Sequence, residues 1–157
     1  MCVIIINESN NRRLNERMVD QAIKKNPHGY GMIDLTTGEV FRTNKDKAAK
    51  KKAMSAGKAI HHFRLASVGG IAEKNIHPFA IDDQEFLFMN GTVRDIITGT
   101  GQTDTEAFAQ ILSNVEPGQR TNVLRYWSAR FAIANIKLGT VEVSGNWFRQ
   151  GDLLMSN

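Results

Sequence analysis

The sequence has one cysteine, Cys2, in 157 residues, and this scarcity excludes several classes of protein. One cysteine cannot form an intrachain disulfide, so no feature calls for an oxidising compartment. The chain has neither a CxxC nor an HExxH pattern, so we expect no metal site. It also lacks a hydrophobic run long enough to span a membrane, and its apolar start is too short for a signal peptide. We therefore expect a cytoplasmic protein with no membrane partner.

The composition is that of an ordinary globular protein, with 41% hydrophobic and 23% charged residues and a net charge of +4. Its length fits one domain over residues 1–157. Five lysines gather in residues 44–53, where aromatic residues and arginine are absent. A basic patch can bind nucleic acid by releasing counterions. We expect instead the solvated face of a short Ala/Lys helix.

The first six residues, Met1 to Ile6, form a continuous apolar run that predicts a strand buried on both faces. Cys2 would lie at the tip of this strand. If Met1 is removed, Cys2 carries a thiol and a free α-amine, with ordinary pKa values of about 8.5 and 7.7–8.0, so the amine can act as the thiol's base. A free cysteine is otherwise a small buried hydrophobe, and a nucleophile needs partners elsewhere in the chain.

The remaining elements arrive in blocks of strands and helices, which favours antiparallel sheets with helices layered outside. Apolar spacing predicts a helix over residues 12–25, and the lysine-rich segment predicts a second helix that ends near Gly57. Residues 103–106 (TDTE) are expected to cap a third helix that buries Phe108, Ile111 and Leu112, and a fourth helix is expected over 119–127. Strands are expected over residues 30–35, 39–43, 59–66, 85–89, 131–136, 141–143 and 153–155.

Five segments stand in an order that resembles the class II glutamine amidotransferases, which have the N-terminal-nucleophile hydrolase fold. They are the Met-Cys start, residues 26–31 (NPHGYG), residues 62–69 (HFRLASVG), residues 75–79 (NIHPF) leading to 88–91 (FMNG), and residues 103–106 (TDTE). None is specific alone, but the resemblance that they carry together extends over nearly the whole chain. The resemblance implies a four-layer αββα sandwich of the α+β class, with two mainly antiparallel sheets flanked by helices. It implies a compact, stand-alone form with no synthase domain after it.

The resemblance also implies roles for six residues. Cys2 would be the nucleophile toward the glutamine side-chain amide. Negative charge then develops on the carbonyl oxygen and needs donors about 2.7–3.1 Å away. The resemblance assigns this oxyanion hole to Asn90 Nδ2 and the Gly91 N–H. For the substrate's α-carboxylate and α-ammonium it implies three binding residues, Arg64 for the carboxylate, Ser67 beside it, and Asp104 for the ammonium.

The expected reaction forms a γ-glutamyl thioester and yields glutamate and ammonia without a cofactor. The ammonia would escape or pass to a separate acceptor-binding synthase. Two other functions stay open, which are hydrolysis of another γ-glutamyl amide and a catalytically weak basic binding module. Arg64 could also be a surface arginine, and Asp104 a helix cap. Met89 and Val68 replace histidines common in the family, while His62 and His77 are expected to order loops around the pocket.

Overall fold

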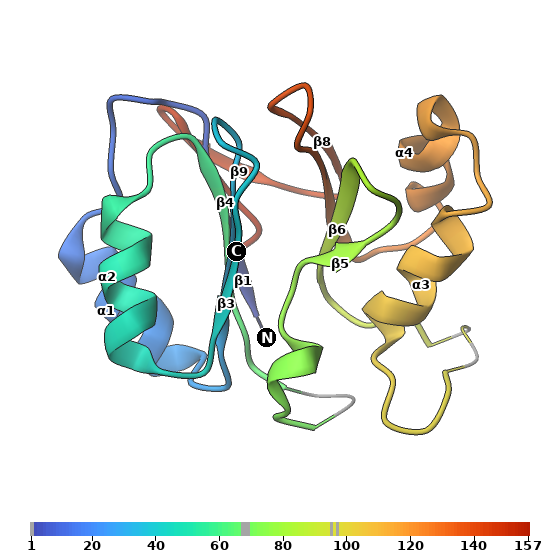
Figure 1. The fold of residues 1–157 in the computed structure, drawn as a ribbon, viewed down its shortest axis with the longest axis horizontal. Coiled ribbons are helices and arrows are strands. Elements are labelled where there is room, and N and C mark those ends of the chain that lie inside the picture. The colour runs from blue at the N-terminus through green and yellow to red at the C-terminus, as the bar shows by residue number, and fades with distance from the viewer. Residues whose placement is uncertain (1, 67–69, 95, 97) are drawn as a thin grey trace.

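The computed structural model describes residues 2–66, 70–94, 96 and 98–157. Two antiparallel sheets face each other, and a pair of helices covers the outer face of each, so the molecule has four layers (Figure 1). This arrangement is the αββα sandwich that the resemblance implies. None of the helices in the described part of the chain is both long and apolar enough to cross a membrane.

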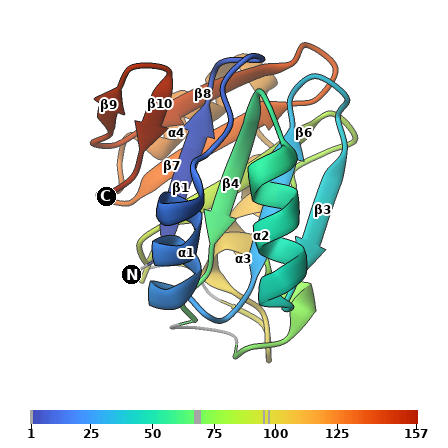
Figure 2. The same cartoon turned by 90° about the vertical axis from the view of Figure 1, so that its left-hand side faces the viewer.

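Sheet A has six strands in the order β3-β2-β4-β1-β10-β9. Its central strand, β1, pairs with β4 on one side and β10 on the other, antiparallel in both cases. Helices α1 and α2 lie side by side over its outer face (Figure 2). The elements of this half are β1 (Val3–Asn7), α1 (Glu16–Lys25), β2 (Tyr30–Asp34), β3 (Val40–Thr43), α2 (Asp46–Ser55), β4 (Ala59–Phe63), β9 (Phe148–Gln150) and β10 (Leu153–Met155).

Sheet B has four strands in the order β5-β6-β7-β8, and helices α3 and α4 cover its outer face. A short 3-10 turn, η1, leads into this half, and a second, η2, precedes α4. The elements are η1 (Glu73–Asn75), β5 (Phe79–Ala80), β6 (Glu85–Asn90), α3 (Asp104–Leu112), η2 (Pro117–Gln119), α4 (Arg120–Leu124), β7 (Arg130–Asn135) and β8 (Thr140–Ser144).

The first strand is buried on both faces, as its apolar run predicts. Successive side chains of a strand point to opposite faces. Ile4 and Ile6 therefore pack between the sheets with Phe88 of β6, whereas Ile5 packs under the helices with Val19 of α1. All of these side chains are at most 2% exposed. The strand that carries Cys2 at its start is thus held firmly from both sides.

Several predicted elements differ in detail from the structure. The first helix begins at Glu16, not residue 12, because the Asn15 side chain caps it by accepting from the Met18 N–H at 2.8 Å. Ile111, expected to be buried, is 46% exposed. Strands β5 and β9 were not predicted, since β5 has only two residues and β9 consists of three exposed ones.

Candidate functional site

A pocket opens where β1 begins and where β4 and β6 end. Sheet A supplies residues from the chain start and from the end of β4, while sheet B supplies the end of β6 and the start of α3. Four of the six predicted site residues line it. The lining residues are Cys2, Arg64, Leu65, Ala66, His77, Met89, Gly91, Thr103, Asp104 and Thr105.

Cys2 directly precedes β1, at the end of sheet A where the pocket opens. The pairing of Val3 with Phe63 brings Cys2 beside Arg64 and Leu65. Its Sγ donates to the Leu65 carbonyl at 3.4 Å and accepts from the Leu65 N–H at 3.3 Å. Burial raises the pKa of the Cys2 thiol above its ordinary value, an effect that the Leu65 hydrogen bond and the Arg64 charge partly offset. The thiol is therefore protonated at neutral pH and needs a base to react.

Arg64 follows β4 and is only 3% exposed, so it is not a surface arginine. Its backbone N–H donates to Gly29 at 2.8 Å, and its carbonyl accepts from His28 at 3.0 Å. The guanidinium Nη2 donates to the Gly70 carbonyl at 2.7 Å. Burial lowers the pKa of Arg64 from its ordinary value, but an arginine stays charged at any physiological pH. Arg64 thus presents a buried cation at the pocket wall, the charge that a carboxylate would pair with.

Asp104 is the first residue of α3 and is 8% exposed. The helix cap is Thr103, whose hydroxyl accepts from the Glu106 N–H at 3.1 Å, so the alternative that Asp104 is the cap is wrong. Asp104 accepts from the backbone N–H groups of Val93 at 3.1 Å and Thr105 at 2.9 Å. An ionised carboxylate has about four lone-pair sites, so Asp104 retains acceptor capacity for an ammonium.

Gly91 directly follows β6 and has a backbone φ of +137°, a value that residues other than glycine rarely adopt. A Cβ added here would approach the Ala129 Cβ to 2.9 Å. The position therefore requires glycine on both conformational and steric grounds. Gly91 lines the pocket from the sheet B side, because it follows β6, whereas Cys2 and Arg64 come from sheet A.

Asn90 is fully buried, and its side chain is not among those that line the pocket. Both hydrogens of its Nδ2 are in use, because it donates to Ser156 Oγ at 2.8 Å and to Asn157 Oδ1 at 2.7 Å. Its Oδ1 has no hydrogen-bond partner in the described part of the chain. The expected oxyanion donor is thus held toward residues after β10, an interaction that no sequence motif indicated. Ser67 lies outside the described residues.

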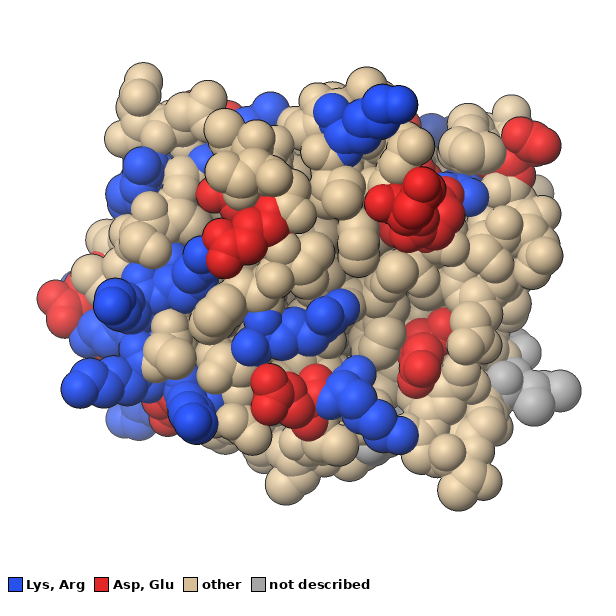
Figure 3. Space-filling view, in the orientation of Figure 1, with Lys and Arg blue, Asp and Glu red and all other residues tan. Residues whose placement is uncertain are grey.

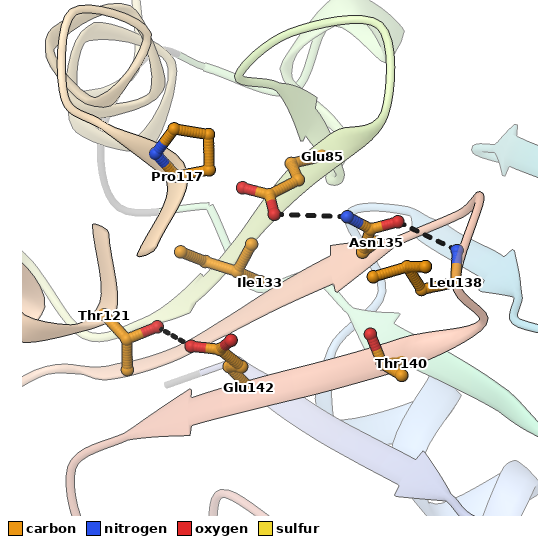
Figure 4. A pocket seen from close by; sticks show the side chains of 8 residues that line it. All are labelled: Glu85, Pro117, Thr121, Ile133, Asn135, Leu138, Thr140 and Glu142. Atoms are coloured by element: carbon orange, nitrogen blue, oxygen red, sulfur yellow. Dashed lines mark hydrogen bonds between the residues drawn. The ribbon is translucent and has the colours of Figure 1, made fainter. Parts of the chain in front are cut away.

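A second pocket lies on the side of sheet B that α4 covers (Figure 4). It contains two carboxylates, but each is already paired. Glu85 accepts from Asn135 Nδ2 at 3.3 Å, and Glu142 accepts from the Thr121 hydroxyl. This pocket shares no residue with the first and contains none of the predicted site residues. Of these two pockets, the first is therefore the one that brings the Cys2 thiol together with Arg64 and Asp104.

Basic side chains gather over α1 and α2, on the left of the molecule in Figure 3. Two lysines of α2 are in ion pairs, Lys50 with Glu16 at 2.7 Å and Lys52 with Glu39 at 2.7 Å. Lys47 and Lys51 are exposed, whereas Ala49 and Ala53 of α2 are buried in the core. The lysine run thus forms the outer face of a short helix, as expected.

No family model matches the sequence, and no curated protein matches it. Some solved structures are similar in fold to this chain. One is the glutamine phosphoribosylpyrophosphate (PRPP) amidotransferase from B. subtilis complexed with ADP and GMP, at 14% identity and a TM-score of 0.61 over 98% of this chain and 40% of that chain. Another is described as the allosteric regulatory enzyme of purine biosynthesis, at 17% identity and a TM-score of 0.58 over 99% of this chain and 41% of that chain.

These similarities extend over nearly the whole of this chain, which spans about two fifths of the length of either enzyme. At such low identity they concern the fold, and they agree with the two-sheet, four-layer arrangement described above. The four-layer αββα sandwich that the resemblance implied is therefore confirmed for this chain.

Proposed function

We propose that this protein is a glutamine amidohydrolase of the class II amidotransferase type, with Cys2 as its N-terminal nucleophile after loss of Met1. The observation that carries the proposal is the pocket itself. Four residues from distant parts of the chain meet there, and they supply a thiol, a buried cation, a glycine and a buried carboxylate. They are the groups that hydrolysis of a free amino acid amide requires, and they are Cys2, Arg64, Gly91 and Asp104.

In the proposed reaction the α-amine of Cys2 takes the thiol proton, and the thiolate attacks the side-chain carbonyl carbon of glutamine. The Gly91 N–H stabilises the resulting oxyanion, joined by Asn90 Nδ2 once that amide leaves Ser156 and Asn157. The C–N bond then breaks, and the ammonium of Cys2 returns its proton to the departing ammonia. A γ-glutamyl thioester remains, and water hydrolyses it to glutamate and the free thiol.

Selectivity for a free amino acid comes from the two charged groups in the pocket wall. Arg64 pairs with the substrate's α-carboxylate, and Asp104 pairs with its α-ammonium. A glutamine within a polypeptide lacks both charges, so it would gain neither of these ion pairs and would bind more weakly. Ser67 remains proposed as a contact beside Arg64. The same two ion pairs would serve another γ-glutamyl amide, and ammonia would be free to reach a separate synthase.

The test uses protein from which Met1 has been removed, as verified by intact mass. It should release glutamate from glutamine, and a glutamine-like diazo-ketone should leave an adduct on Cys2. Cys2→Ala should abolish both signals, and continued glutamate release by this variant would refute the mechanism. Assays with asparagine and γ-glutamyl peptides separate glutamine from related substrates. No turnover of any amide, with salt-sensitive nucleic-acid binding, would favour a binding module instead.

A further inference from the structure

His77 lies between the two halves of the pocket, and sheet A holds the segment that carries it. The His77 carbonyl lies against Gly31 of β2 so closely that a Cβ there would come within 1.7 Å of it. Arg42 of β3 donates to the carbonyl of Ile76 at 3.0 Å and to that of Pro78. The backbone on both sides of His77 is thus fixed to sheet A, although the chain continues directly into β5 of sheet B.

The His77 side chain reaches from this anchored backbone to the start of α3. Its ring is 5% exposed and packs with its centroid 4.0 Å from that of His62 and 5.1 Å from that of Phe79. Its Nε2 lies 3.1 Å from Thr105 Oγ1. Thr105 in turn donates its backbone N–H to Asp104 Oδ1 at 2.9 Å. A continuous path of contacts therefore joins sheet A to the carboxylate of Asp104.

This path matters because the two charged groups of the pocket come from opposite halves of the sandwich. Arg64 follows β4 of sheet A, while Asp104 begins a helix that covers sheet B. The distance between Arg64 and Asp104 therefore depends on how rigidly the sheet A half and the sheet B half of the sandwich are held together. A displacement of about 1 Å at a binding group can cost on the order of 100-fold in rate.

We propose that His77 is a positioning residue which, through its hydrogen bond to Thr105, sets the place of Asp104 relative to Arg64 and so selects an amide substrate that carries an α-ammonium. The inference rests on the proposed function and adds the element that defines substrate length and charge. Burial lowers the pKa of His77 well below its ordinary value. The neutral ring therefore places no positive charge beside the site for the ammonium.

The test compares two substitutions of Thr105 in protein with Met1 removed. Thr105→Val keeps the side-chain shape and removes the hydroxyl, whereas Thr105→Ser keeps the hydroxyl. The valine variant should raise KM for glutamine by about tenfold or more with kcat within about twofold, because uniform substrate binding is lost. The serine variant should stay within about twofold of the native KM. Should the valine variant fail to fold, Thr105→Ala replaces it.

Two results would overturn the inference while leaving the proposed function intact. One is a native KM in the valine variant, and the other is an equal loss of activity in the valine and serine variants. A double variant adds a stricter test, since Thr105→Val should raise KM little further when Asp104→Asn is already present. Additive effects of the two substitutions would also refute the inference. An inactive native protein would instead refute the proposed function.

Discussion

The side-chain amides of Asn90 and Asn157 are joined by a hydrogen bond of 2.7 Å, from Nδ2 of the first to Oδ1 of the second. Ser156 completes the contact, because its Oγ accepts from Asn90 Nδ2 at 2.8 Å and from the Ile4 N–H at 2.9 Å. The end of β6 is thereby tied to the strand that begins beside Cys2. This link connects the Asn90–Gly91 corner with β1, at whose start Cys2 lies.

Ser156→Ala should destabilise the protein, because Ser156 is fully buried and two donors would lose their acceptor. Leaving a buried donor unsatisfied costs about 1–3 kcal/mol. Chemical denaturation should therefore show a free energy of unfolding lower by about this amount. Ser128→Ala is the matched control, since Ser128 is exposed and its substitution should change stability by less than about 0.5 kcal/mol. Equal stabilities of the two variants would contradict the proposed link.

Gly91→Ala should impair both stability and glutamate release. The substitution forces a non-glycine residue to a φ of +137° and brings a methyl group to 2.9 Å from the Ala129 Cβ. Strain of this kind costs about 1–3 kcal/mol, and displacement of one oxyanion donor costs about 100-fold or more in kcat. Denaturation and steady-state kinetics measure the two effects.

The control for this substitution is Gly118→Ala in the η2 turn. Nothing lies within 4 Å of a Cβ added at Gly118, so this variant should keep native stability and kcat. If Gly91→Ala retained native kcat while losing stability, Gly91 would be a structural residue without a role in the reaction.

The sequence was sufficient to predict the layers of the fold and most of its strands. Period-two and continuous apolar patterns identify β1, β2 and β6 because their side chains are buried against another layer. The exposed residues of β9 offer no such signal, since this edge strand is held by backbone pairing with β10. Ile111 was misjudged because helical spacing does not say how far around a helix the core extends.

The site was predicted less completely than the fold. Cys2, Arg64, Gly91 and Asp104 stand in recognisable motifs, and the structure brings them to one pocket. The orientation of Asn90 was not predictable, because it depends on Ser156 and Asn157, which are more than 60 residues away and lie in no motif. Long-range polar contacts between side chains leave no periodic trace in a sequence. The contact between Thr105 and His77, on which the proposed positioning depends, was not predicted for the same reason.

Retention of Met1 should abolish the proposed glutamate release, because the proposed base is the α-amine of Cys2 itself. In the chain that keeps Met1, burial raises the pKa of the Cys2 thiol above its ordinary value. Alkylation by iodoacetamide should then be slow at pH 7 and should accelerate only above about pH 9. The processed protein should react faster at pH 7 and release glutamate. Mass spectrometry reads both outcomes, and equal glutamate release by the two forms would exclude the amine as base.

Three buried histidines should make the folded state sensitive to acid. Burial lowers the pKa of His61 to about 4 and that of His62 to about 3, and it places the pKa of His77 well below its ordinary 6.5. Between about pH 6.5 and 4 the unfolded chain therefore binds more protons than the folded protein. The free energy of unfolding should be constant with respect to these groups above pH 6.5. As the pH decreases from 6.5, the free energy of unfolding should decrease by up to about 1.4 kcal/mol per pH unit for each histidine.

His62→Leu isolates one of these contributions, because neither ring nitrogen of His62 has a hydrogen-bond partner among the described residues. The substitution removes one proton-binding group from the unfolded chain. Among the described residues it breaks no hydrogen bond to the His62 ring. Urea denaturation at pH 7, 5.5 and 4.5 should then show a shallower loss of stability than in the native protein, by about one proton. An unchanged slope would mean that His62 is already protonated, and so not buried neutral, in the folded state.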